Sequence, residues 1–318
     1  MTDSLIIRPE SIHDLIQREI PKNPCWIEPN ILPKYGKLLF GGHAKVGKSF
    51  IMLELARALA SGTSPFECHY FSVPEPVKVL VIEQELGPYG LQKRVKQVYK
   101  NVDDHILREN LWYVSRAPEL QFDNLVGRKY IHDLIAEVQP NVLIIDPAGK
   151  IHSYEENSNS DISRFWNHID ALLKEFRHLD MSLILSHHFG KPARDPRWEV
   201  DPLSPYNFRG ASKWYDDPDC LVTVVRGLPM INTPNEAWYI RTRWESRHGE
   251  TPEDLVFSVN REGDLRVRYE GHDSDMRRPA KVSTSSARPA AEQKSGPLSL
   301  HNTSSSGLVT PLKMQLGR

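Results

Sequence analysis

The sequence lacks long apolar runs, contains few cysteines and has no excess of charge of either sign. Its longest apolar stretches, such as Val79–Ile82 and Val142–Ile145, are far shorter than the roughly 18 residues of a membrane-spanning helix, so we expect no membrane partner. The three cysteines are widely separated. They exclude a disulfide framework and a paired-cysteine zinc site, and they favour a reducing, cytoplasmic location. With a net charge of −1, any binding of nucleic acid must depend on a local basic strip.

The composition changes after about Tyr269. From Gly271 to Arg318 the sequence contains no Phe, Trp or Tyr and is rich in serine and proline. Such a segment cannot bury enough apolar surface to offset the entropy lost on ordering, so we expect a disordered tail. The expected organisation is an N-terminal extension over residues 1–25, one folded domain over 26–270 and the tail over 271–318.

Short apolar runs alternate with amphipathic stretches between the two ends of the chain. Buried strands are expected at Gly36–Phe40, Val77–Ile82, Leu111–Val114, Asn141–Ile145, Met181–Leu185 and Leu221–Val225. Helices are expected at Lys48–Ala60, near Leu91–Tyr99, at Tyr130–Val138 and at Ser160–His178. Three antiparallel strands are expected at Ala237–Arg243, Asp254–Val259 and Asp264–Tyr269. This pattern predicts an α/β fold with a mostly parallel central sheet, helices on both faces and antiparallel C-terminal strands.

A glycine-rich loop joins the first long strand to the first long helix. It matches the phosphate-binding pattern G-x-x-x-x-G-K-[ST], and its residues are Gly42, His43, Ala44, Lys45, Val46, Gly47, Lys48 and Ser49. Such a loop points backbone N–H groups at phosphate oxygens, and the following helix N-terminus adds partial positive charge. We expect Lys48 to reach the β- and γ-phosphates and Ser49 to bind Mg²⁺. Phe50 is included among the expected nucleotide-binding residues.

Acidic residues follow two of the other expected strands. Asp146 ends the run Asn141–Ile145, where a carboxylate can serve the metal side of a nucleotide site. Glu83 and Glu85 follow the run Val79–Ile82, and a carboxylate there can orient or deprotonate the attacking water. Strand alternation predicts that the two glutamates share a face, and the sequence alone does not show which of them acts on the attacking water.

Two further motifs complete the candidate site. His187 and His188 follow the strand at Met181–Leu185, where a polar side chain can bind a γ-phosphate and report its loss. Adjacent histidines on a strand point apart, which makes them poor joint metal ligands. Arg209 precedes the strand at Leu221–Val225. An arginine there can stabilise transition-state charge, in its own subunit or across a subunit boundary.

Taken together, these motifs resemble the RecA-like ATPases of the RepA hexameric helicase group, within the wider DnaB/RecA superfamily. The runs that carry the resemblance span about Trp26–Arg226; they are GKLLFGGHAKVGKSFIMLELARALASG, VLVIEQE, NVLIIDPAGKIHSYEEN, LILSHHFGK and RGASKWYDDPD. The resemblance implies that the strand at Met181–Leu185 is inserted between the P-loop strand and the Asp146 strand.

The resemblance also implies roles for individual residues. Glu85 matches the hydrolytic glutamate, with Glu83 in reserve, and His188 matches the γ-phosphate sensor. Arg209 matches an arginine finger that reaches into the neighbouring subunit's site. The implied cofactors are ATP and Mg²⁺, and the implied partners are other copies of the chain in a ring, commonly a hexamer, together with single-stranded DNA.

The resemblance implies that the proline-rich stretch from Lys191 to Phe208, which we call the channel loop, faces the central channel of the ring. This stretch is not a simple basic strip. Its cationic and stacking residues are Lys191, Arg194, Arg197 and Trp198, whereas Asp195, Glu199 and Asp201 dilute the positive charge. Three interpretations therefore stay open. The first is a DNA-stimulated ATPase motor of the helicase or translocase type. The second is an ATP-switched regulatory or loading protein of a mobile element, which binds replication or recombination proteins without unwinding DNA. The third is a small-molecule kinase, weakened by the lack of a lid segment with clustered arginines.

Overall fold

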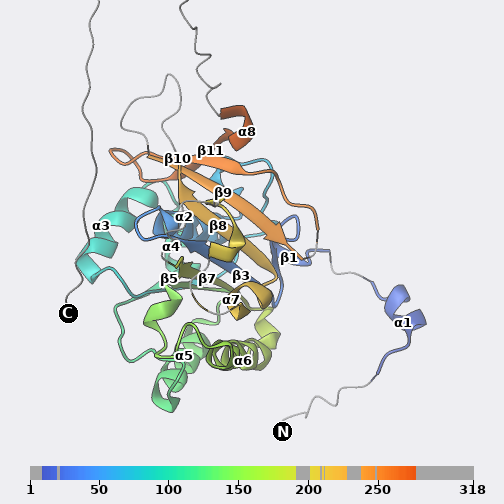
Figure 1. Ribbon diagram of the computed structural model, residues 1–318. Helices are drawn as coiled ribbons and strands as arrows, with labels where there is room; N and C mark the ends of the chain where they lie inside the picture. The colour runs from blue at the N-terminus through green and yellow to red at the C-terminus, as the bar shows by residue number, and fades with distance from the viewer. Residues whose placement is uncertain are drawn as a thin grey trace, which may run out of the picture. The chain divides into compact units, whose positions relative to one another are not determined.

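The computed structural model describes residues 9–19, 22–190, 201–207, 210, 212–227, 238–247 and 249–276. In this part of the chain one large sheet contains nine strands, in the order β11-β10-β9-β8-β3-β7-β6-β4-β5 (Figure 1). The strands are β3 (Lys37–Gly42), β4 (Val79–Glu83), β5 (Leu111–Ser115), β6 (Val142–Asp146), β7 (Ser182–His188), β8 (Cys220–Arg226), β9 (Trp238–Ser246), β10 (Leu255–Val259) and β11 (Val267–His272). A small separate sheet pairs β1 (Cys25–Ile27) with β2 (Leu32–Pro33).

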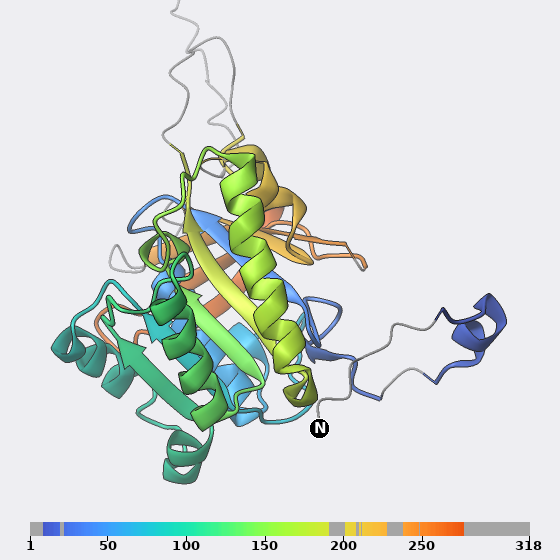
Figure 2. The same ribbon diagram turned by 90° about the horizontal axis from the view of Figure 1, so that it is seen from below.

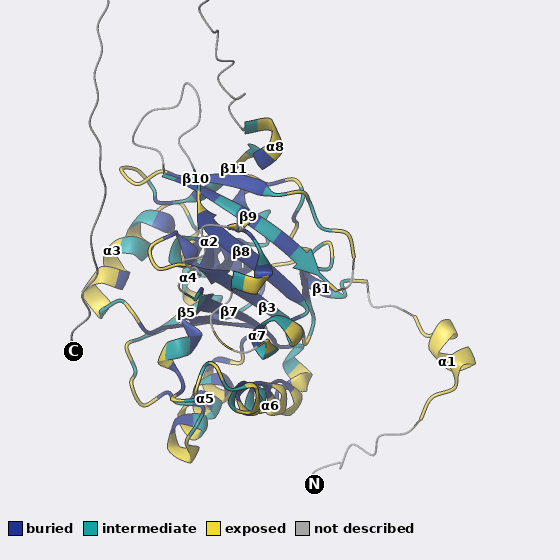
Figure 3. Cartoon of the chain, viewed as in Figure 1, coloured by how far each residue is buried: buried dark blue, intermediate teal, exposed yellow. Residues whose placement is uncertain are grey.

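Helices cover both faces of the large sheet. The helices of the described residues are α1 (Ile12–Gln17), α2 (Lys48–Ser61), α3 (Pro88–Val98), α4 (Asp104–Glu109), α5 (Leu125–Val138), α6 (Asn159–Glu175), α7 (Lys213–Asp216) and α8 (Asp273–Met276). Of these, α1 has no buried residue and does not cover the sheet (Figure 1). Figure 2 shows α5 and α6 side by side on one face, where they share an apolar cluster with alternate residues of the parallel strands. On the opposite face α2 packs in a second cluster. The strands between are buried on both sides, as Figure 3 shows, which explains their continuous apolar sequence.

The parallel part of the sheet agrees with the sequence prediction. Strands β3 to β8 pair in parallel, and the antiparallel pairs begin at β8–β9. As the resemblance implied, β7 lies between β3 and β6. The helix expected from residue 48 ends at Gly62, whose left-handed backbone (φ 63°) caps α2. The sequence analysis missed α4 and the β1–β2 pair, because short elements carry too little periodicity to be recognised.

The C-terminal strands are tied to the body of the domain by buried charge. Glu54 of α2 is fully buried, and it accepts hydrogen bonds from Arg57 and from Arg266 at the start of β11. A carboxylate in such a position must be paired, because an unpaired buried charge is strongly destabilising. The two arginines therefore fix the last hairpin against α2.

The expected boundary at residue 270 falls inside β11 and needs correction. Gly271 pairs with Val256, and Asp273 forms an ion pair with Arg241 at a side chain that is 9% exposed. Composition did not reveal these contacts, because the stretch from Gly271 lacks aromatic residues and its partners lie on other strands of the sheet. Residues 277–318, the remainder of the expected tail, lie outside the described residues. Within the described residues, no helix combines the length and apolarity needed to cross a membrane.

The helix α6 provides a direct test of this packing. Phe165 is completely buried and contacts the rings of Phe122 and Trp214. Replacing it with alanine should therefore lower the free energy of unfolding by about 3–5 kcal/mol, measured by urea denaturation. The matched control is Arg164→Ala, which removes an exposed ion pair with Asp161 and should cost less than about 1 kcal/mol. Equal losses for the two variants would contradict this assignment of the core.

Candidate active site

The loop between β3 and α2 depends on two glycines, Gly42 and Gly47. Residues of β8 and β9 lie so close to them that a side chain would not fit. A Cβ on Gly42 would lie 2.4 Å from the carbonyl oxygen of Val224, and a Cβ on Gly47 would lie 2.4 Å from Cδ1 of Ile240. Gly47 also has a left-handed backbone (φ 114°) and offers no side chain to cap the first N–H groups of α2. These groups are therefore available to an anion.

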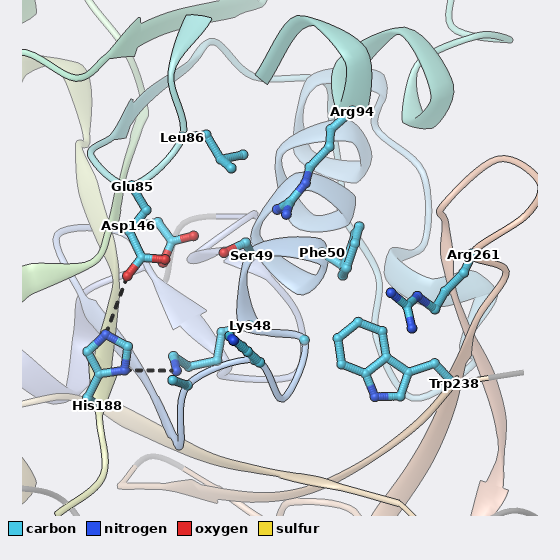
Figure 4. A pocket seen from close by; sticks show the side chains of 13 residues that line it. Lys48, Ser49, Phe50, Glu85, Leu86, Arg94, Asp146, His188, Trp238 and Arg261 are labelled. Carbon is cyan, nitrogen blue, oxygen red and sulfur yellow. Dashed lines mark hydrogen bonds and ion pairs between the residues drawn. The ribbon is translucent and has the colours of Figure 1, made fainter. Parts of the chain in front are cut away.

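A cavity of about 510 Å³ opens in front of this loop. The residues that line it come from seven regions of the chain, and Figure 4 shows ten of them with labels. The lining residues are Ala44, Lys45, Gly47, Lys48, Ser49, Phe50, Glu85, Leu86, Arg94, Asp146, His188, Trp238 and Arg261. Three residues predicted to bind the nucleotide do not line it: Gly42 packs on β8, Val46 is buried, and His43 contributes its carbonyl to Lys48.

Lys48 is held at the base of the cavity by its own loop. Its ammonium donates hydrogen bonds to the carbonyl oxygens of Gly42 (2.8 Å) and His43 (3.0 Å), and it lies 3.4 Å from Nδ1 of His188. Burial lowers the pKa of Lys48 to about 8, although the nearby carboxylates of Asp146 and Glu85 act in the opposite direction. Among the described residues this buried lysine has no direct salt bridge, and it lies where phosphate oxygens can supply negative charge.

The structure separates the two glutamates that the sequence left together. β4 ends at Glu83, so the predicted alternation does not extend to Glu85, and the two side chains do not share a face. The Glu83 carboxylate is buried and accepts hydrogen bonds from the backbone N–H groups of Glu85 and Leu86. Burial raises the pKa of Glu83 to about 7. Glu83 therefore holds the backbone of the loop that follows it, whereas Glu85 lines the cavity.

Glu85 and His188 face each other across the cavity, as the dashed line in Figure 4 marks. The Glu85 carboxylate lies 3.5 Å from Nε2 of His188. This contact is the main reason why the pKa of Glu85 is lowered, against the opposing effect of partial burial. The adjacent His187 turns the other way, is 1% exposed and stacks on Trp214 with ring centroids 4.1 Å apart. Of the two histidines, His188 is therefore the one that can touch a ligand.

Asp146 and Ser49 lie on the same side of the cavity as Glu85 (Figure 4). The buried Asp146 carboxylate accepts a hydrogen bond from the hydroxyl of Ser186 on β7. The described residues contain no group of three or more His, Cys, Asp or Glu side chains that could hold a metal by themselves. A hydroxyl and a carboxylate suit a hard cation such as Mg²⁺, which takes its other ligands from phosphates and water. The donor set thus fits the predicted metal.

The far side of the cavity contains the predicted Phe50 together with three residues that the sequence analysis missed, Arg94, Trp238 and Arg261. Phe50 and Trp238 meet edge to face, with centroids 5.7 Å apart. The guanidinium of Arg94 lies 4.9 Å from the Phe50 ring centroid, and that of Arg261 lies 4.9 Å from the Trp238 ring centroid. We call these four side chains the aromatic–arginine cluster. They come from separate elements, so no local motif could reveal them. The predicted Arg209 and the loop residues 191–200 lie outside the described residues.

The lowered pKa of Lys48 leads to a prediction for ligand affinity. Raising the pH through about 8 removes the ammonium charge in the free protein, so affinity for a nucleoside triphosphate should fall, by up to about tenfold per pH unit. Arginine stays charged in this range, and Lys48→Arg should bind with an affinity that does not change with pH. Calorimetric titrations at several pH values measure both. Parallel pH profiles for the two proteins would contradict the assignment.

Comparison with known proteins places this site in a family. The chain is similar to a solved structure of the flagellar accessory protein FlaH from Methanocaldococcus jannaschii, with 13% identity, a TM-score of 0.47, and coverage of 74% of this chain and 89% of that chain. This similarity is too low to indicate an activity. No curated protein matches the chain. The family model described as "AAA domain" matches residues 4–194, which is more than half of the sequence and includes the phosphate-binding loop. The chain therefore belongs to the AAA domain family and is a RecA-like P-loop ATPase.

Proposed function

We propose that this ATPase is a ring-forming motor that hydrolyses ATP with Mg²⁺ and acts on single-stranded DNA, as a replicative helicase or translocase does. The observation that carries the hydrolytic part is the convergence of Lys48, Glu85, Asp146 and His188 on one cavity in front of the phosphate-binding loop. Each comes from a different strand end or helix start, and each supplies a distinct chemical group to the same space.

Binding begins at the loop. Phosphate oxygens accept from the uncapped N–H groups at the start of α2, and Lys48 exchanges the carbonyl oxygens of Gly42 and His43 for phosphate oxygens. The ligand charge favours the ammonium form, which burial otherwise disfavours. Ser49 and Asp146 are the residues that would hold Mg²⁺, which when bound neutralises charge on the β- and γ-phosphates.

Hydrolysis depends on Glu85. Its lowered pKa keeps the carboxylate ionised at neutral pH, so it can accept a proton from the water that attacks the γ-phosphate, or orient that water. His188 contacts both Glu85 and Lys48. Loss of the γ-phosphate therefore changes the contacts of His188, which ends β7, and the predicted channel loop follows shortly after in the sequence.

The aromatic–arginine cluster is the proposed nucleobase subsite. It lies on the same cavity as the phosphate groups but on the opposite side from Glu85 (Figure 4). A base can stack on the aromatic rings, next to the guanidinium groups of Arg94 and Arg261.

The DNA and ring parts of the proposal rest on sequence. The predicted channel loop contains three cations and a tryptophan, which suit a single strand, and Arg209 would complete a neighbour's site. The alternative, an ATP-switched loading or regulatory protein, is favoured by the net charge of −1 and by the acids in that loop.

Three measurements decide between the motor and the switch: hydrolysis with and without single-stranded DNA, negative-stain imaging with an ATP analogue, and unwinding of a forked duplex. DNA-stimulated hydrolysis by rings that unwind the fork supports the motor, whereas ATP binding without unwinding supports the switch.

The separate environments of the two glutamates lead to a second prediction. Glu85→Gln should retain ATP affinity while the turnover rate falls about 10²- to 10⁴-fold, since a general base or water-orienting carboxylate is lost. Glu83→Gln should have a smaller effect, because an amide still accepts hydrogen bonds from the following loop. Single-turnover hydrolysis and calorimetric binding distinguish the two steps. A larger loss of turnover for Glu83→Gln would transfer the catalytic assignment to Glu83.

The nucleobase subsite can be tested without measuring hydrolysis. Trp238→Ala should weaken ATP binding by about five- to 150-fold, which corresponds to the 1–3 kcal/mol of base stacking. Binding of inorganic tripolyphosphate, which has no base, should be unchanged. Trp238→Phe is the matched control and should recover most of the affinity for ATP. Equal weakening of both ligands by Trp238→Ala would show that the indole supports the phosphate loop rather than the base.

A further inference from the structure

A second cavity of about 620 Å³ lies beside the active site and shares Glu85 with it. It is lined by Gln84, Glu85, Arg116, Pro118, Gln121 and Lys150. These residues follow β4, β5 and β6, so this cavity and the ATP cavity open at the same edge of the sheet. Two of the six side chains are cationic, and the single acid among them is the carboxylate already in contact with His188.

The donors of this cavity are only partly used. The side-chain amides of Gln84 and Gln121 donate to backbone carbonyls. Arg116 donates from Nε (3.2 Å) and Nη2 (3.0 Å) to one acceptor, the backbone carbonyl of Glu85, which leaves both N–H groups of Nη1 and one of Nη2. The exposed ammonium of Lys150 forms no ion pair or hydrogen bond in the described part of the chain. The donors left over in the described part of the chain are therefore three guanidinium N–H groups of Arg116, one amide N–H of Gln84 and the Lys150 ammonium. A guanidinium and an ammonium together suit a phosphate group.

Arg116 also belongs to a clamp on the backbone of the catalytic glutamate. The Glu83 carboxylate accepts from the N–H groups of Glu85 and Leu86, and the hydroxyl of Ser115 donates to the Leu86 carbonyl (2.9 Å). Arg116 holds the remaining polar group, the Glu85 carbonyl. Of these clamping side chains, Arg116 is the one that lines the second cavity. A ligand bound there therefore contacts a residue that fixes the position of Glu85.

We propose that the second cavity is a phosphate-binding site and that its ligand regulates hydrolysis through Arg116. Lys150 and the unused N–H groups of Arg116 bind the phosphate oxygens, and the bound phosphate draws the Arg116 guanidinium away from the Glu85 carbonyl. The backbone at Glu85 then shifts, which changes how its carboxylate meets the attacking water. Two candidate ligands carry such a phosphate group. One is a phosphodiester of a nucleic-acid strand, and the other is the free phosphate released from the adjoining cavity. Only the regulatory step rests on the proposed ATP hydrolysis; binding does not.

Binding is tested with the full chain and two probes, a labelled oligothymidylate followed by fluorescence anisotropy and inorganic phosphate followed by calorimetry. Lys150→Ala should weaken whichever probe is the ligand about tenfold. For the oligonucleotide, the slope of log affinity against log salt concentration should also become smaller by about one, as expected for the loss of one phosphate contact. Lys129→Ala, which removes an exposed lysine paired with Asp133 on α5, is the control and should bind like the wild type. The probe that responds identifies the source.

Two results would overturn the binding proposal. One is equal affinity of Lys150→Ala and Lys129→Ala for both probes, which would place any phosphate binding elsewhere. The other is tighter, Lys150-dependent binding of polyglutamate, which would assign the cavity to an acidic protein. Because no step here requires turnover, failure of the ATPase proposal would appear separately, as a lack of ATP binding or hydrolysis in the same preparations.

The coupling is tested with Arg116→Lys, which keeps the positive charge but cannot donate two hydrogen bonds from a rigid fork. This variant should bind the responding probe within about twofold of the wild type, since a cation is retained. Its turnover without the probe should be reduced, and adding the probe should no longer change it. A thermal melt checks that the variant is folded. A variant that still responds fully to the probe would show that Arg116 does not carry the coupling.

Discussion

The position of β7 between β3 and β6 is the constraint on which the site depends. In the parallel register Gly42 pairs with His188, and Glu83 pairs with Asp146 on the neighbouring strands. This arrangement brings His188 to Lys48 at 3.4 Å and to Glu85 at 3.5 Å. It also places Ser186 against Asp146. A shift of β7 by one residue would exchange His188 for His187 and turn the buried ring into the cavity.

Two glutamates separated by one residue have opposite electrostatic roles. Glu83 is buried at the end of a strand, where the loss of hydration raises its pKa to about 7. Glu85 lies in the loop beyond, where His188 lowers its pKa. The first organises the backbone of the loop and the second faces the ligand. Different environments give two similar carboxyl groups in one site different pKa values, and therefore allow them different roles.

The antiparallel strands do more than extend the sheet. Arg266 fixes β11 to Glu54 on α2, and Ile240 of β9 packs against the glycine that begins this helix. The same strands bring Trp238 and Arg261 to the cavity. The phosphate-binding loop and the proposed base subsite are therefore both held by the antiparallel strands.

The sequence by itself determined the α/β class, the phosphate-binding loop and the strand ends that bear Asp146, the glutamates and the histidines. Those features are local, since a continuous apolar run or a fixed glycine spacing depends on neighbouring residues alone. The choice of Glu85 and His188 over their neighbours came from family resemblance, and only side-chain direction in the folded chain gave it a physical basis. Only the tertiary structure could bring Arg94, Trp238 and Arg261 together, or place Arg116 on the Glu85 carbonyl. Those contacts join residues that are far apart in the chain, and their spacing leaves no repeating pattern in the sequence.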